Sequence, residues 1–156
     1  MIDRADPASW KSFQYPGGSD VQENHGAGDL GHLQNLQKAL QTAADLSRHY
    51  DAPICYVSVA SAAPGSVAHN PKEFGDKLGA FASSQAEAHG IRTTSMPLIS
   101  HDPSVDLDDT LIRGIADSGS DLVVMGSHIP GLPDHFFASN AGYVASHAKV
   151  SVMVIR

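Results

Sequence analysis

The sequence predicts a three-layer α/β/α fold with a mostly parallel, twisted sheet. Helical and strand-like patterns alternate from residue 30 onward, and the apolar runs lack the polar alternation of half-exposed strands. Alternation of this kind, with right-handed crossovers, places helices on both faces of a parallel sheet. The chain has 156 residues, 42% of them hydrophobic, which suffices for one such domain. We expect that domain over residues 29–156, after a polar leader over residues 1–28.

The first helix is predicted from apolar residues at three- and four-residue steps between Leu30 and Leu46. Asp29 precedes this row and is positioned to cap the helix. Residues 53–60 follow as a short apolar strand with several β-branched side chains. Its single cysteine, Cys55, is predicted to be a buried small apolar residue rather than a nucleophile.

The second helix has a strong start signal. Asn70, Pro71 and Glu73 combine an N-cap, a first-turn proline and a capping-box acid, and Gly90 marks the end of the helix. A weaker strand follows over residues 91–100, and we expect it at an edge of the sheet. A helix over residues 106–118 comes next. The chain then has strands over residues 121–126 and 150–155, with a short amphipathic helix between them that ends at His147.

The strand over residues 121–126 opens into a loop, and small polar residues start the helix beyond it. In a parallel α/β sheet such a loop faces the carboxyl ends of the strands, where ligands bind. The following helix directs free N–H groups and its positive dipole end at the same place, which favours an anion, most often a phosphate. The residues concerned are Gly126, Ser127, His128, Pro130, Ser139 and Asn140.

These residues resemble the universal stress protein family, and within it the bacterial F/G-like subgroup. That subgroup reads Gly-Ser-His-x-Pro and then Gly-Ser-Asn-Ala, which residues 126–130 and 139–141 match apart from the second motif's glycine. The broader family pattern is Gly-x-x-Gly, nine residues, and Gly-Ser/Thr. Here Ile129 stands at the second glycine and Ala138 at the third, where a methyl group crowds a backbone that must approach phosphate closely.

The resemblance covers residues 29–156 and implies the Rossmann-like fold of the adenine nucleotide α-hydrolase type found in this UspA-like superfamily. It implies ATP as the ligand, with AMP or ADP as alternatives and Mg²⁺ as an accompanying ion. Val59 is similar to the residue that lines the adenine pocket, and Asp29 to the acid that reaches the adenosine end. The full implied site is Asp29, Val59, Met125, Gly126, Ser127, His128, Pro130, Ser139 and Asn140.

Structural roles are the alternative for the same residues. Gly126 can simply end a strand, and Ser139 and Asn140 are ordinary first residues of a helix. A buried valine such as Val59 is a core residue by default, and Asp29 serves equally well as a helix cap.

The leader does not fit the family. Universal stress proteins begin with a strongly apolar central strand that ends in Asp, whereas the residues before Asp29 are polar and rich in turn formers. The best strand candidate, residues 10–15, is too polar for a position between two helical layers. Three alternatives remain: an unrelated or out-of-frame sequence in place of the native strand, a disordered extension, or an irregular segment that fills the central position in another way. A vacant position would leave unpaired backbone groups at a cost of roughly 1–3 kcal/mol each.

Several other classes are disfavoured by composition. A net charge of −7 with ten scattered basic residues argues against nucleic-acid binding. The nine histidines form no pair at metal-ligand spacing, and no serine lies in a Gly-x-Ser-x-Gly elbow. We find no apolar stretch of about 18 residues and no secretory signal pattern, so we expect no membrane span and a cytoplasmic location.

The predicted function is a nucleotide-binding regulatory module, as the resemblance implies, in a stress response or in control of a membrane transporter. The alternatives are a slow Mg²⁺-dependent ATPase or phosphotransfer enzyme and a nucleotide-free dimeric scaffold. The resemblance also implies a homodimer through the last strand, Val150 to Ile155, with a tetramer as the larger assembly. An apolar strand at a sheet edge needs such cover.

Overall fold

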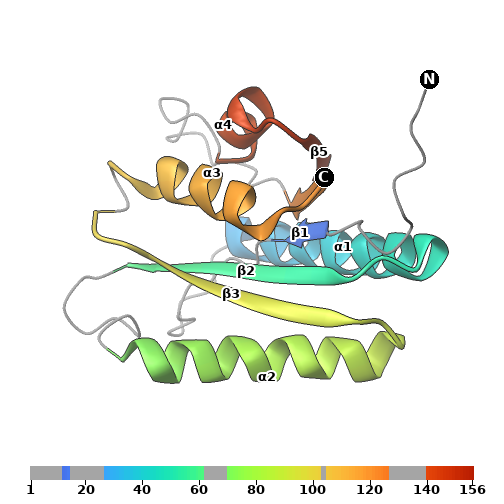
Figure 1. Ribbon diagram of the computed structural model, residues 1–156. Helices are drawn as coiled ribbons and strands as arrows, with labels where there is room; N and C mark the ends of the chain where they lie inside the picture. The colour runs from blue at the N-terminus through green and yellow to red at the C-terminus, as the bar shows by residue number, and fades with distance from the viewer. Residues whose placement is uncertain (1–11, 15–26, 62–69, 103–104, 127–139) are drawn as a thin grey trace.

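The computed structural model describes residues 12–14, 27–61, 70–102, 105–126 and 140–156. Within these ranges it contains a five-stranded sheet in the order β3-β2-β1-β4-β5, in which every neighbouring pair is parallel. The predicted fold class is therefore confirmed (Figure 1). The elements are β1 (Ser12–Gln14), α1 (Ala27–Tyr50), β2 (Ile54–Ser61), α2 (Pro71–His89), β3 (Thr93–Ser100), α3 (Leu107–Ser118), β4 (Leu122–Gly126), α4 (Asn140–His147) and β5 (Ser151–Ile155).

The central position of the sheet is taken by β1, which pairs with β2 on one side and β4 on the other. Phe13 lies opposite Cys55 in β2 and Val123 in β4. The expectation that residues 10–15 are too polar for this position is thus wrong for Ser12–Gln14. Pairing gives ladder partners to two strands that would otherwise expose backbone groups, and this gain does not depend on apolar side chains. The rest of residues 1–26 lies outside the described ranges.

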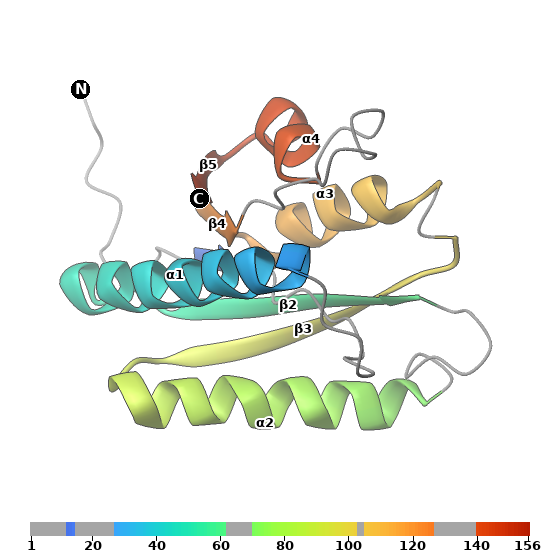
Figure 2. The same cartoon turned by 180° about the vertical axis from the view of Figure 1, so that it is seen from behind.

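Alternation along β2 divides the core between the two faces of the sheet. Cys55, Val57 and Val59 belong to one apolar cluster, which includes Leu111 of α3 and Val144 of α4. Ile54 and Tyr56, which alternate with these residues, belong to a second cluster with residues of α1 and α2. Figures 1 and 2 show the same division, with α3 and α4 on one side of β2 and β3 and α2 on the other.

The face of α1 that meets the sheet differs from the predicted leucine row. Asn35, Ala39 and Ala43 follow one another at four-residue steps, and each is at most 4% exposed. Leu36 and Leu40 are only half-buried at the side of this row. Small side chains at the centre of the contact let the helix axis approach the sheet closely, while the larger leucines reach around it.

Asp29 does not cap α1, because the helix begins two residues earlier, at Ala27. The residue lies in the first helical turn instead. A carboxylate there still interacts favourably with the positive end of the helix dipole.

The predicted ends of α2 are confirmed. The Asn70 side-chain oxygen accepts a hydrogen bond of 3.1 Å from the Glu73 backbone N–H. Gly90 ends α2 in the left-handed conformation at φ 64°, and Gly119 ends α3 in the same way at φ 63°. The edge position predicted for the strand over residues 91–100 is also confirmed, as β3 and β5 are the outer strands. Among the described residues, no helix is both long and apolar enough to cross a membrane.

Candidate functional site

The carboxyl ends of the strands form the edge at which the sequence predicts a ligand site. Val59 lies near the end of β2, and Met125 and Gly126 end β4. The structure brings Val59 and Met125 into one apolar cluster. The third turn of α1 lies against Gly126 at the same edge.

Packing against α1 leaves little room for a side chain at Gly126. A Cβ atom at this position would lie 3.1 Å from the carbonyl carbon and oxygen of Asn35 and 3.1 Å from the backbone nitrogen of Leu36. Any side chain would therefore push against the backbone of α1. This contact explains the glycine without a ligand, so the structural alternative for Gly126 has direct support.

Asn35 is the partner that the sequence did not reveal. It is 4% exposed and occupies the position closest to the end of β4. The only signal was its four-residue spacing from Ala39, which places it in line with the small residues of α1. A polar residue in such a row is hard to assign to a buried face before the fold is known.

Val59 and Met125 are 6% and 4% exposed. Their contacts in the structure are with the cluster under α3 and α4, which is the role of core residues. They also make the apolar part of the carboxyl edge, so their assignment to an adenine pocket stays a prediction.

The helix α4 begins at Asn140, beyond the connection that leaves β4. Ala141 and Val144 are 4% and 1% exposed and join the core cluster, so apolar contacts hold the first turn in place. The predicted residues Ser127, His128, Pro130 and Ser139 lie outside the described residues, as do the side chains of Asp29 and Asn140.

A polar cluster joins the start of α3 to α4. The Tyr143 hydroxyl donates to an Asp109 carboxylate oxygen at 3.3 Å, and the Tyr143 ring stacks on His147 at 3.9 Å. Burial raises the pKa of Asp108, the negative charge of Asp109 raises it further, and the charge of His147 opposes both. Burial, followed by Asp109, also raises the pKa of Tyr143.

At the end of β3, the Asp106 carboxylate is held by its neighbours. The Ser100 hydroxyl donates to one carboxylate oxygen, and the His101 backbone N–H donates to the other at 3.1 Å. The bond from Ser100 is the larger cause of the lowered pKa of Asp106. This carboxylate therefore fixes the turn into α3. Among the described residues, no group of three or more histidine, cysteine or acidic side chains gathers in a metal-binding arrangement.

A parallel sheet with a glycine at the carboxyl end of β4 and a core-anchored helix start beyond it defines a Rossmann-like α/β protein. The model of the universal stress protein family matches residues 31–156. The chain therefore belongs to the universal stress protein family. The finer assignment to the F/G-like subgroup stays a prediction.

Several solved structures of similar fold are universal stress proteins. One from Burkholderia pseudomallei is 20% identical and gives a TM-score of 0.64 over 97% of this chain and 98% of that chain. A universal stress protein in complex with cAMP is 14% identical, with a TM-score of 0.63 over 96% and 98%. A family member from Arabidopsis thaliana with AMP bound is 16% identical, with a TM-score of 0.59 over 94% and 90%. Comparison with curated proteins found no match.

Proposed function

We propose that this protein binds an adenine nucleotide, ATP in the first place, at the carboxyl edge of its sheet and acts as a regulatory module. One observation carries the proposal: α4 starts at this edge, and Ala141 in its first turn and Val144 in its second are anchored in the core. The positive end of a helix dipole is thereby held in one place, which favours a phosphate. Similar family members carry AMP or cAMP, which supports an adenine nucleotide.

The chemistry of the edge suits such a ligand. Val59 and Met125 offer apolar contact for an adenine ring, and Asp29, in the first turn of α1, is the acid assigned to the adenosine end. The phosphates would be held by Gly126, Ser127, His128, Pro130, Ser139 and Asn140. No step of bond breaking is needed for this role, since occupancy alone stabilises the native state and can be read by a partner.

A second function, a nucleotide-free scaffold, has one specific observation in its favour. The close approach of α1 favours a glycine at position 126 whether or not a ligand binds. Nucleotide binding must therefore be tested directly rather than inferred from the glycine.

The test is thermal unfolding with and without millimolar ATP and Mg²⁺. A ligand at a hundred times its dissociation constant adds about 2.7 kcal/mol to the free energy of unfolding, or roughly 5–10 °C in Tm for a domain of this size. Asn140→Asp keeps a good helix-start residue but places a negative charge where the phosphates would lie, so most of the ATP-dependent shift should disappear. Ser146→Asp adds the same charge at an exposed position near the other end of α4 and should retain the shift.

Two results would contradict the proposal. One is an unchanged Tm in a sample that unfolds cooperatively, which would leave the scaffold as the function. The other is an equal loss of the shift in both variants. Release of ADP in the same samples would show turnover and favour the enzyme alternative.

We further propose a homodimer formed by β5, the terminal edge strand. Met153 on this strand is 36% exposed, whereas Val152 packs against the core cluster and is the poorer position to mutate. Met153→Lys should lower the mass measured by light scattering to that of a monomer. Val105→Lys, at a position that is 76% exposed and lies just before α3, should leave the mass unchanged. A dimeric Met153→Lys protein would contradict this interface. A transporter partner and a cytoplasmic location remain predictions of the sequence.

A further inference from the structure

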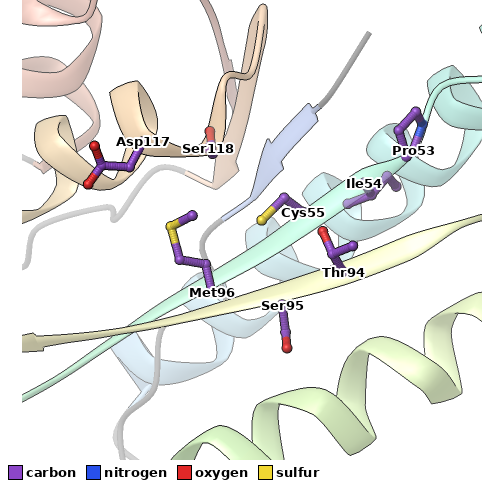
Figure 3. A pocket seen from close by; sticks show the side chains of 8 residues that line it. All are labelled: Pro53, Ile54, Cys55, Thr94, Ser95, Met96, Asp117 and Ser118. Atoms are coloured by element: carbon purple, nitrogen blue, oxygen red, sulfur yellow. The ribbon is translucent and has the colours of Figure 1, made fainter. Parts of the chain in front are cut away.

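A pocket of about 310 Å³ lies at the opposite end of the sheet from the carboxyl edge, under the last turn of α3 (Figure 3). Cys55 and Thr94 are the second residues of β2 and β3 and lie opposite each other in the ladder. The pocket therefore opens at the amino ends of these strands. Nothing in the proposed nucleotide function uses this place.

The inner wall of the pocket is apolar. Figure 3 shows Cys55 and Met96 directed into the space between the two strands and α3. Pro53 extends this wall at the start of β2, whereas the Ile54 side chain belongs to the cluster on the opposite face of the sheet. Ser95 lines the pocket with its backbone only, because its side chain points to the opposite face of the sheet. There the Ser95 hydroxyl lies 3.8 Å from the position that a Cβ atom of Gly79 in α2 would take. An apolar body would be in contact with most of this surface.

The rim of the pocket is negative. Asp117 lies there on the last turn of α3, is exposed, and forms no ion pair within the described ranges. The C-terminal end of α3 adds the negative end of the helix dipole and has no basic residue in its last turn. The neighbouring Ser118 hydroxyl is already engaged, donating to the Ile115 carbonyl at 2.8 Å and lying 2.7 Å from the Ser120 hydroxyl.

The cation closest to the pocket along β3 is also engaged. Arg92, two residues before Thr94, donates to the Asp51 carbonyl and to its carboxylate at 3.3 Å. Among the described residues that line the pocket, the one charged side chain is that of Asp117, and its charge is negative.

We propose that this pocket binds a small organic cation, a primary amine on an apolar body. Its volume lies at the lower end of the roughly 300–1,000 Å³ typical of ligand pockets, so the ligand is smaller than a nucleotide. The apolar body packs against Cys55 and Met96, and the ammonium group faces the Asp117 carboxylate and the end of α3. This site goes beyond the proposed nucleotide function and does not depend on it.

The test is an NMR titration of the ¹⁵N-labelled protein with three probes of one shape: benzylamine, benzyl alcohol and benzoate. We expect benzylamine to shift the backbone amides of Cys55, Thr94 and Ser118, with an affinity roughly fivefold higher than that of benzyl alcohol. Benzoate should leave these amides unshifted. Equal affinities for the three probes, or shifts confined to other parts of the sheet, would overturn the proposal.

Variants at exposed positions complete the test without disturbing the core. Asp117→Asn should lower the benzylamine affinity to that of benzyl alcohol. Glu87→Gln changes the net charge equally on α2, across the sheet, and should leave the affinity unchanged. An Asp117→Asn protein with wild-type preference for benzylamine would refute the role of the carboxylate. ATP, which is assigned to the other end of the sheet, should not shift the pocket amides, so the two proposals fail separately.

Discussion

Gly126→Ala tests whether packing against α1 requires the glycine at the end of β4. The new methyl group would lie 3.1 Å from three backbone atoms of Asn35 and Leu36. This distance is several tenths of an ångström shorter than an ordinary van der Waals contact. Because the neighbouring atoms are helix backbone rather than a flexible side chain, β4 or α1 must move.

Overpacking of this kind costs typically 1–3 kcal/mol. Replacing glycine by alanine in a strand returns roughly 0.5–1 kcal/mol by restricting the unfolded chain, so we expect a net loss of about 1 kcal/mol. For a domain of about 150 residues this corresponds to a Tm lowered by roughly 2–4 °C.

The matched control is Gly79→Ala in α2, whose new methyl group would lie 3.8 Å from the Ser95 hydroxyl, an ordinary contact. It should gain about 0.5–1 kcal/mol from helix propensity and raise the Tm slightly. Both free energies of unfolding are measured by urea denaturation in the absence of nucleotide. A Gly126→Ala protein as stable as the wild type would refute the packing account and leave ligand approach as the reason for the glycine.

Three further predictions concern buried polar groups and a helix cap. The Tyr56 hydroxyl is buried with no hydrogen-bond partner in the described part of the chain, so Tyr56→Phe should leave the free energy of unfolding at pH 7 unchanged or raise it by up to about 1 kcal/mol in urea denaturation. Burial raises the pKa of Tyr56 to about 12, above its value in the unfolded chain. The neutral Tyr56 side chain therefore contributes stability that is fully present below pH 10 and is lost as the pH rises toward 12. Between pH 9 and 11, the free energy of unfolding of the wild type should fall by about 1 kcal/mol more than that of the variant. Because the pKa of Asp108 is raised, the contribution of this side chain to the stability of the fold becomes unfavourable as the pH rises through that pKa. Asp108→Asn should therefore raise the Tm at pH 7 and have little effect on the Tm below pH 4. Equal changes in Tm at both pH values would contradict this. Asn70→Ala removes the bond to the Glu73 N–H and should cost about 0.5–2 kcal/mol by the same urea assay, whereas an unchanged midpoint would show that the cap does not stabilise α2.

The parts of the fold that were predictable carry their signals locally. Asn70, Pro71 and Gly90 set the ends of α2 through caps that involve only neighbouring residues, and the structure agrees with them. The run from Ile54 to Ser61 is apolar enough to be recognised as a strand covered on both faces.

The central strand was not predictable because its position depends on pairing rather than on composition. Only Phe13 among Ser12–Gln14 is apolar, yet these residues complete the ladders of β2 and β4. The sheet-facing row of α1 was obscured in a similar way, since the leucines are more conspicuous in the sequence than Asn35, Ala39 and Ala43.

The candidate site was also predictable only in its local parts. The sequence showed a glycine at the end of a strand, Gly126, followed by the start of a helix at Asn140. The contact of Gly126 with Asn35 and the pocket between Cys55 and Asp117 join segments that are distant in the chain. Neither has a local pattern that could reveal it.

The central claim is that an adenine nucleotide binds at the carboxyl edge of the sheet. Its most direct test is a ¹⁵N NMR titration with ATP and Mg²⁺, read at assigned backbone amides. We predict saturable shifts at Val59, Gly126 and Ala141, with Cys55 and Thr94 at the other end of the sheet unmoved. Unchanged amides at the carboxyl edge at millimolar ATP, or shifts confined to the other end, would contradict it.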